Sequence, residues 1–552
     1  MKKYLILTSL LFLTFFSFAQ SLDEAKKFMY YERWESAEKT LRQLIQQQPQ
    51  DMDAYYWLAA CLLEQDKKAE AKQLLATANE QIAKGAKETP MLKVAAGELL
   101  LRDSLHTEAA QKFEDALKDT KQKDPDVLMA VARAYLNAKR TNYDYVLDIL
   151  DKAAKRDKNN PAVYTLQGEV YRRMQDGGKA VQSYMTALEK DANYAKAEYS
   201  IGKIYLTQQN TEYFLKHFTN AVQKDPAYTP ALYELYYYYY FRDVNLAKDY
   251  LDKYIANRDP SVENDYMLID LMYVSSKHAQ ALEMARQLLQ KEKDAAQPRL
   301  YKLIAYSYEA LGDSTNAMEY INTYFGRAVD TQLVAKDFEL RAKLLQKFAG
   351  NEEKAIADLQ RAIEMDTLAA NKANYMTGLA KLNKKMGNRS QEAYWLGQLY
   401  SAKENATNLD LYNWGLAHYS AQEYPKADSV FAMYTEKYPE HIHGYYWRAK
   451  SNALIDTTME LGLAVPYYQK VIELAAPDSL KNKSLLIQAY GYVGAYQANV
   501  KKDFEDALAQ FGKILELDPQ NADAIRYSDI LKKWVKNEAE KSGSDKSVTE
   551  NK

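Results

Sequence analysis

Cysteine, glycine and proline are scarce in this 552-residue chain, which has 1 Cys, 19 Gly and 13 Pro. The single cysteine, Cys61, has no partner for an intrachain disulfide, and the helical apolar pattern around it predicts a small buried residue. Few glycines and prolines, and no Pro/Gly-rich linker, favour helix throughout. The chain is too long for one ordinary core, so it contains either several domains or a repeat array that grows in one dimension.

An excess of one charge is also lacking, because 73 Lys and Arg oppose 75 Asp and Glu for a formal net charge of -2. The two signs are interspersed, so no basic footprint indicates nucleic acid. Beyond the first twenty residues, no run is long and apolar enough to cross a bilayer.

Motifs that carry chemistry are absent too. The chain has no nucleophile elbow, P-loop, dinucleotide-binding glycine turn, zinc-protease motif or paired-cysteine metal site. His441 and His443 could bind a divalent ion weakly, but their place at a turn favours two solvated side chains. The sequence therefore predicts a protein that is not an enzyme, with no catalytic, cofactor-binding or metal site and no cofactor.

The first residues, "MKKYLILTSLLFLTFFSFAQ", have two lysines, an apolar run and small residues before a cleavage point. This pattern predicts a signal peptide over residues 1–19, cleaved after Ala19. A membrane anchor is the alternative, but the run from Leu5 to Phe18 is shorter than the about 20 residues that a span needs. The leader therefore predicts an exported protein. No cysteine follows the cut, so the lipid attachment that bacterial lipoproteins use is not expected.

The chain has strong internal self-similarity. A set of small and large apolar residues that begins at Gly168 recurs 34 residues later from Gly202. Further copies begin at Ala25, Ala59, Ala305 and Gly415, and a last copy ends at Pro519. A small residue near the middle of the first helix lets the second helix approach closely, and another small residue lies early in the second helix. A large apolar residue four positions after that fills the gap to the next pair. One such pair cannot bury its apolar face alone, so neighbouring pairs must stack.

These residues resemble the tetratricopeptide repeat, a helix-turn-helix family with a period of about 34 residues. The resemblance implies an all-α, right-handed superhelical solenoid of roughly fourteen repeats over residues 20–519. A capping helix is expected over 520–540 and a disordered polar tail over 541–552. The register is least defined near residues 371–400.

Five consecutive tyrosines, Tyr236 to Tyr240, lie in the stretch "ALYELYYYYYFRD". In the repeat register Leu232, Leu235, Tyr236 and Tyr239 face the neighbouring helices. Tyr233, Tyr237, Tyr240 and Phe241 lie on a separate arc. In the family that arc lines the concave groove, where polypeptide segments bind. It predicts a partner-binding groove formed by Tyr233, Tyr237, Tyr240, Phe241, Tyr199, Tyr306, Tyr412, Tyr419, Tyr446 and Tyr56. Tyrosine suits recognition because it combines large area with a hydroxyl, although single tyrosines can also be packing filler.

The leading hypothesis is an exported scaffold or adaptor that binds protein or peptide segments in this groove. The leader, which ends "FAQ", looks like those of Bacteroidetes-type bacteria, so the periplasm is expected, with envelope assembly or secretion as settings drawn from family analogy. The alternatives are a carbohydrate-binding protein that uses groove aromatics, and a secreted or outer-membrane-associated location. The identity of the partner and the oligomeric state stay open.

Overall fold

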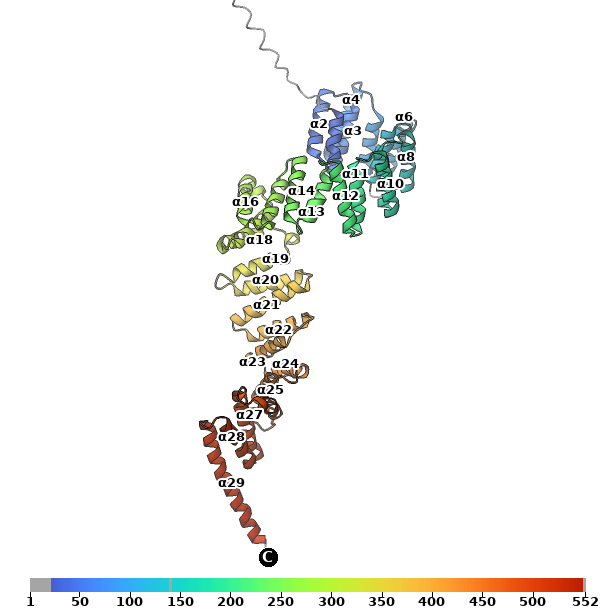
Figure 1. Cartoon of the computed structure of the whole chain (residues 1–552). Helices are drawn as coiled ribbons and strands as arrows, with labels where there is room; N and C mark the ends of the chain where they lie inside the picture. The colour runs from blue at the N-terminus through green and yellow to red at the C-terminus, as the bar shows by residue number, and fades with distance from the viewer. Residues whose placement is uncertain (1–20, 139–140, 550–552) are drawn as a thin grey trace, which may run out of the picture. The chain divides into compact units, whose positions relative to one another are not determined.

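The computed structural model describes residues 21–138 and 141–549, and every regular element in those ranges is a helix (Figure 1). No strand occurs among the described residues, which confirms the all-α prediction. The predicted signal peptide, residues 1–19, lies outside the described ranges.

The chain divides between Ala296 and Gln297 into two compact units. The helices of the first unit are α1 (Leu22–Tyr30), α2 (Trp34–Gln47), α3 (Met52–Glu64), α4 (Lys68–Ala83), α5 (Pro90–Arg102), α6 (His106–Asp119), α7 (Pro125–Leu136), α8 (Tyr143–Arg156), α9 (Pro161–Arg173), α10 (Gly177–Lys190), α11 (Ala195–Thr207), α12 (Thr211–Lys224), α13 (Thr229–Tyr239), α14 (Val244–Asn257), α15 (Val262–Val274), α16 (His278–Glu292) and the short η1 (Lys293–Ala295).

The helices of the second unit are α17 (Pro298–Ala310), α18 (Ser314–Arg327), η2 (Asp330–Gln332), α19 (Ala335–Leu345), α20 (Glu352–Met365), α21 (Ala369–Lys385), α22 (Arg389–Ala402), α23 (Asn408–Ser420), α24 (Tyr424–Lys437), α25 (Ile442–Ile455), α26 (Val465–Ala475), η3 (Ala476–Asp478), α27 (Lys483–Tyr496), η4 (Gln497–Lys501), α28 (Phe504–Leu517) and α29 (Ala522–Thr549).

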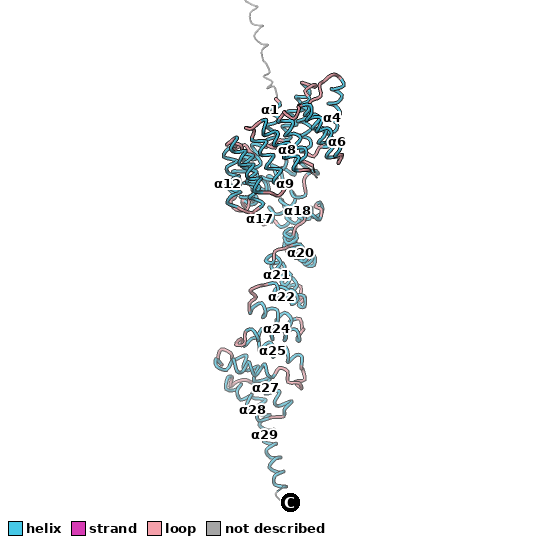
Figure 2. The backbone as a smooth tube through the Cα atoms, turned by 90° about the vertical axis from the view of Figure 1, so that its right-hand side faces the viewer, coloured by secondary structure: helices cyan, strands magenta, loops and turns pink. Residues whose placement is uncertain are grey.

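Within each unit the helices form pairs joined by short loops (Figure 2). Each odd-numbered helix packs on the even-numbered helix that follows it, and that helix packs on the first helix of the next pair. Helices α1–α16 give eight pairs and α17–α28 give six. The described residues therefore contain fourteen pairs, as the sequence predicts, including a regular pair α21–α22 where the register was least defined.

Helices within a pair come close because small residues face large ones. A Cβ added at Gly202 of α11 would lie 2.6 Å from the ring of Phe218 on α12. The same relation holds for Gly168 and Tyr184, where the distance to the ring would be 2.4 Å. Atoms this close would have to shift, so the aromatic ring occupies the space that the missing side chain leaves. The glycine-to-aromatic spacing of the repeat is thus a packing contact.

The pair α13–α14 reverses this arrangement. Tyr236 occupies the position that Gly202 has in the preceding pair, and it is 6% exposed. It packs on Ala247 and Leu251 of α14. The residue in the place of Phe218 is Asp252, which is exposed and pairs with Lys248. The bulky group has therefore moved from the second helix to the first.

The last helix differs from the prediction in its length. Helix α29 begins at Ala522, close to the expected start of the capping helix, but it continues to Thr549. It thus includes most of the segment 541–552 that the sequence analysis assigned to a disordered tail. Residues 550–552 lie outside the described part of the chain.

Candidate partner-binding surfaces

The sequence-predicted groove residues have three different environments. Some are exposed at α13, two lie in the packed interior of the first unit, and the rest belong to the second unit. Each environment gives these side chains a different capacity to contact a partner.

Helix α13 presents an aromatic row to solvent. Its buried side carries Leu232, Leu235 and Tyr236, as the repeat register predicts. On the opposite arc Tyr233 is 41% exposed and Tyr237 is 60% exposed. Their rings are stacked, with centroids 6.4 Å apart and planes 16° apart. One helical turn separates the two side chains, so they lie next to each other on one face of the helix.

Phe241 extends this row but lies in the turn after α13, because the helix ends at Tyr239. It is 74% exposed. Tyr240 is half-buried, and its ring meets that of Phe241 edge to face at 4.6 Å. We define the aromatic row as Tyr233, Tyr237 and Phe241, with Tyr240 as its support.

The neighbours of the aromatic row are also aromatic or cationic. Tyr254 of α14 lies 5.5 Å from Tyr233, and the guanidinium of Arg258 lies 4.8 Å from the Tyr254 ring. Tyr238, for which the repeat register gives no role, packs edge to face on Phe214 at 5.5 Å. The run of five tyrosines thus divides between the core, the preceding pair and solvent.

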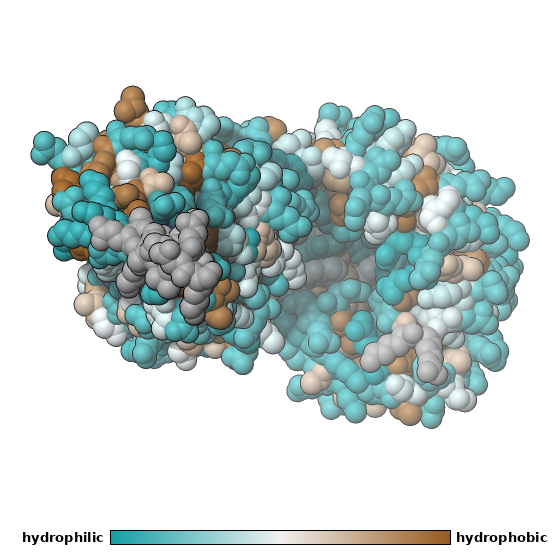
Figure 3. All heavy atoms as spheres, turned by 90° about the horizontal axis from the view of Figure 1, so that it is seen from below, coloured by the Kyte–Doolittle hydropathy of each residue, from teal (hydrophilic) through white to brown (hydrophobic). Residues whose placement is uncertain are grey.

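The rest of the surface offers a comparison for this row. On the face drawn in Figure 3, most of the surface is hydrophilic and apolar side chains form small separate groups. Three large aromatic side chains in succession are therefore a local concentration of apolar area, and such patches mark interaction sites.

Tyr56 and Tyr199 do not lie on an open groove. Tyr56 is 2% exposed, and burial raises its pKa to about 12. Tyr199 is half-buried, with its ring 5.7 Å from Phe218 and 5.7 Å from Tyr228. Burial also raises the pKa of Tyr199. The structure corrects the expectation for both residues, because packing within the first unit covers the arc on which they lie.

Three of the predicted tyrosines gather around Trp447 in the second unit. The Trp447 indole N–H donates to the hydroxyl of Tyr412 at 2.9 Å. The rings of Tyr419 and Tyr446 lie 4.9 Å and 5.4 Å from the Trp447 ring. The Tyr446 hydroxyl also donates to Gln488 Oε1 at 2.8 Å. All three tyrosines are half-buried, so this cluster is mainly a packing feature.

Sequence reasoning missed Trp447 because it followed tyrosines alone, although Trp447 is next to Tyr446 in the sequence.

Tyr306 lies apart from this cluster, on α17. Its hydroxyl donates to Asp337 Oδ1 at 3.1 Å, which is a structural role within the solenoid.

No group of three or more His, Cys, Asp or Glu in the described ranges could hold a metal ion. His441 instead pairs its Nδ1 with the Tyr434 hydroxyl at 2.9 Å. Cys61 is fully buried, as predicted, and burial raises the pKa of its thiol to about 12. In the same ranges, no helix has both the length and the apolar character that a membrane crossing requires.

Comparison with known proteins identifies two segments of the chain. Residues 29–87 and residues 411–441 match family models described as tetratricopeptide repeat. None of the curated proteins matches the chain.

Several solved structures are similar to it. The C-terminal part of a TPR repeat-containing protein from Cytophaga hutchinsonii is 31% identical, and the match covers 48% of this chain and 98% of that one, with a TM-score of 0.32. A tetratricopeptide repeat protein from Parabacteroides merdae is 19% identical over 48% of this chain and 96% of that one, with a TM-score of 0.30. YrrB, described as a TPR protein with an unusual peptide-binding site, is 19% identical over 35% of this chain and 96% of that one, with a TM-score of 0.22.

Proposed function

The chain belongs to the tetratricopeptide repeat family, and on that premise we propose that it is an exported, non-enzymatic scaffold that binds polypeptide segments at the aromatic row of α13. Proteins of this family generally mediate protein–protein interactions. The observation that carries the proposal is the exposure of Tyr233, Tyr237 and Phe241, at 41%, 60% and 74%.

This exposure has a physical cost that folding alone does not explain. Full burial of a large apolar side chain such as Phe contributes roughly 1.5–3 kcal/mol, and these partly exposed side chains forgo the corresponding fraction of it. The other face of α13 is fully packed, so the row is not needed to complete the core. Aromatic side chains in such positions supply much of the binding energy of protein interfaces, because they bury a large area and have few rotors to restrict.

The place of action is part of the proposal. The leader-like first 19 residues support export. We propose the periplasm as the compartment, with a secreted or outer-membrane-associated location as the alternative. Envelope assembly or secretion are the settings that we propose from the family role. Cell fractionation followed by N-terminal sequencing tests this part, and a mature chain that begins at Gln20 is the expected result.

A co-purification experiment tests the binding surface. We expect a polypeptide to be recovered with the wild-type chain and to fall at least tenfold when Tyr237 and Phe241 are both replaced by alanine. Tyr213→Ala is the matched control, since Tyr213 is an exposed tyrosine (43%) outside the row. Equal recovery with the double variant would overturn the proposal. Binding of a glycan array that is lost in the double variant, without a polypeptide partner, would instead favour the carbohydrate-binding alternative.

A further inference from the structure

The first helix pair contacts helices that lie about 200 residues later in the chain. The Thr229 hydroxyl at the start of α13 donates to the backbone carbonyl of Tyr31. The ring of Tyr30 lies 5.2 Å from that of Tyr228 and 6.0 Å from that of Tyr194. The first unit is therefore closed on itself, with the end of α1 against the starts of α11 and α13.

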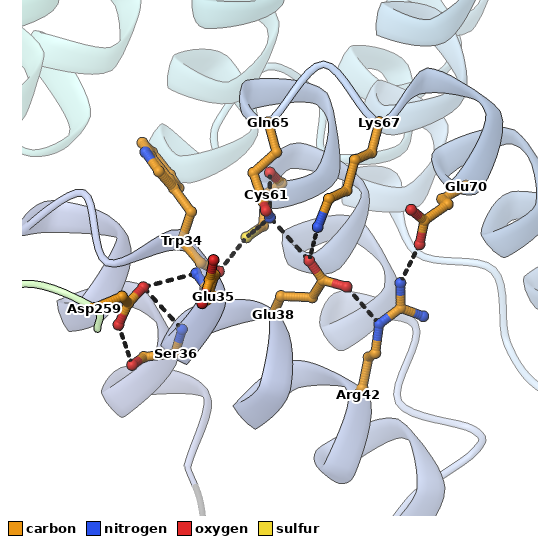
Figure 4. A network of polar contacts seen from close by, with 10 residues as sticks. All are labelled: Trp34, Glu35, Ser36, Glu38, Arg42, Cys61, Gln65, Lys67, Glu70 and Asp259. Atoms are coloured by element: carbon orange, nitrogen blue, oxygen red, sulfur yellow. Dashed lines mark hydrogen bonds and ion pairs between the residues drawn. The ribbon is translucent and has the colours of Figure 1, made fainter. Parts of the chain in front are cut away.

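A carboxylate from the α14–α15 turn completes this contact (Figure 4). One oxygen of Asp259 accepts from the backbone N–H groups of Glu35 at 2.8 Å and of Ser36 at 3.1 Å. The other accepts from the Ser36 hydroxyl and from Arg33 Nε, the latter at 3.4 Å. Helix α2 has no cap from its own N-cap side chain. Asp259 therefore acts as the N-cap of a helix that begins 225 residues before it. We call this set of contacts the junction.

The junction consists of side-chain contacts and lacks broad helix stacking. Helices α1 and α2 pack broadly on each other and on α3. Among the described residues, neither helix packs in that way on α11, α13 or α15. Tyr30 and Tyr31 pack on a small buried cluster that includes Tyr228, but no broad helix face has to separate there. We therefore expect the junction to open at a lower free-energy cost than the broadly packed helix pairs.

The segment held at the junction has a definite chemistry. Two adjacent aromatic residues, Tyr30 and Tyr31, are followed by Glu32. Burial and the nearby Glu64 raise the pKa of Glu32, and Lys196 and Lys203 are the cationic groups that oppose this effect. Aromatic rings receive the first residue, and ammonium groups face the third. The receiving surface thus offers rings to the aromatic residue and cationic groups near the carboxylate.

We propose that Tyr194, Lys196, Tyr228 and Thr229, at the starts of α11 and α13, form a docking site for a polypeptide segment with adjacent aromatic residues followed by a carboxylate. The segment Tyr30–Glu32 occupies this site in cis. A partner segment of the same chemistry competes with it and binds when the junction opens. This inference does not depend on partner binding at the aromatic row, because the two surfaces use different residues.

A labelled peptide of residues 26–32, "KKFMYYE", probes the site in the full chain by fluorescence anisotropy. It ends before the residues that Asp259 binds, so replacing Asp259 leaves the peptide's own contacts unchanged. Asp259→Ala removes the cap of α2, and the loss of these charge-assisted hydrogen bonds should raise the fraction of chains with an open junction. Because the peptide binds only the open form, its affinity should rise about tenfold over wild type. The matched control is Glu38→Ala. Glu38 accepts from Arg42, Gln65 and Lys67 within the first two pairs (Figure 4), so its loss should leave the affinity unchanged.

Two further arms keep the test decisive. A peptide with glutamine in place of the glutamate at position 32 should bind the Asp259→Ala chain several-fold more weakly than the normal peptide does. The normal peptide should likewise bind a chain with both Asp259→Ala and Lys196→Gln several-fold more weakly than it binds Asp259→Ala alone. Tyr30→Ala weakens the cis segment, because it removes the ring that lies against Tyr228 and Tyr194, and it leaves the docking residues intact. This variant replaces Asp259→Ala if that chain does not fold. The proposal is overturned if opening variants bind the peptide no better than wild type, or if the altered peptide binds as well as the normal one.

Discussion

Replacing Gly415 with alanine tests the packing rule that forms each repeat. Gly415 lies in the middle of α23, and an added Cβ would lie 2.7 Å from two carbons of the Phe431 ring on α24. Phe431 is fully buried, and its ring is stacked at 6.2 Å on Trp447 of the next pair. The ring cannot move away without disturbing that pair, so the added methyl group overpacks the contact.

Two opposing effects determine the magnitude. Overpacking a well-packed core costs about 1–3 kcal/mol. Alanine is favoured over glycine inside a helix by about 1 kcal/mol. We therefore expect Gly415→Ala to destabilise its pair by about 1 kcal/mol. Gly512 of α28 has no atom within 4 Å of the added Cβ, so Gly512→Ala should stabilise by about 0.5–1 kcal/mol.

Native-state hydrogen exchange is the suitable assay, because long repeat arrays do not unfold in a single two-state step. The opening free energy of α23 and α24 should fall in Gly415→Ala, and that of α28 should rise in Gly512→Ala. Adding Phe431→Leu to Gly415→Ala should show a favourable coupling of about 1–2 kcal/mol. Equal stabilisation by both alanines, or no coupling, would refute the size-matching account.

Three further predictions concern charges and exposure. Arg341 donates to both oxygens of the buried Asp358 at 2.7 Å and 2.6 Å, so Arg341→Ala should destabilise α19–α20 by about 3 kcal/mol in the same exchange experiment; a change below about 1 kcal/mol would contradict this. Burial raises the pKa of Glu198, but hydrogen bonds from His217 and Lys224 outweigh it and hold the pKa below its usual value. The stability that this carboxylate contributes is fully present above about pH 4.3, the ordinary pKa of a glutamate. It is lost as the pH falls through the lowered pKa of the folded state. The thermal midpoints of wild type and Glu198→Gln should therefore differ at pH 6 and converge towards pH 3, and a constant difference would argue against the pairing. Tyr237→Ala should change stability by less than about 0.5 kcal/mol, since the side chain is 60% exposed; a larger loss would mean that the aromatic row is structural.

The repeat pattern predicted most of the fold because it is a local packing code. A small residue such as Gly202 and a large one such as Phe218 lie sixteen positions apart, and their contact needs only one turn between two helices. The same code placed Leu232, Leu235 and Tyr236 on the buried side of α13. It did not predict that α13 ends before Phe241, because the end of a helix depends on which backbone groups are capped.

The environments of Tyr56 and Tyr199 could not be predicted in this way. Whether an inner position is open depends on what other parts of the chain cover it, and the junction joins residues 198 positions apart, Tyr31 and Thr229. No spacing rule within a single repeat contains that information. Trp447 is a different case. It is next to Tyr446 in the sequence, but the tyrosine pattern from which the groove was predicted does not include it.

Site-specific photo-crosslinking tests the central claim most directly. A photoreactive phenylalanine analogue is introduced at position 237 in one strain and at position 213 in another, and crosslinks are analysed in intact cells. The account predicts a discrete crosslinked polypeptide at position 237 and none of comparable yield at position 213. Crosslinks of equal yield at the two positions, or none at position 237, would contradict a partner-binding surface on α13.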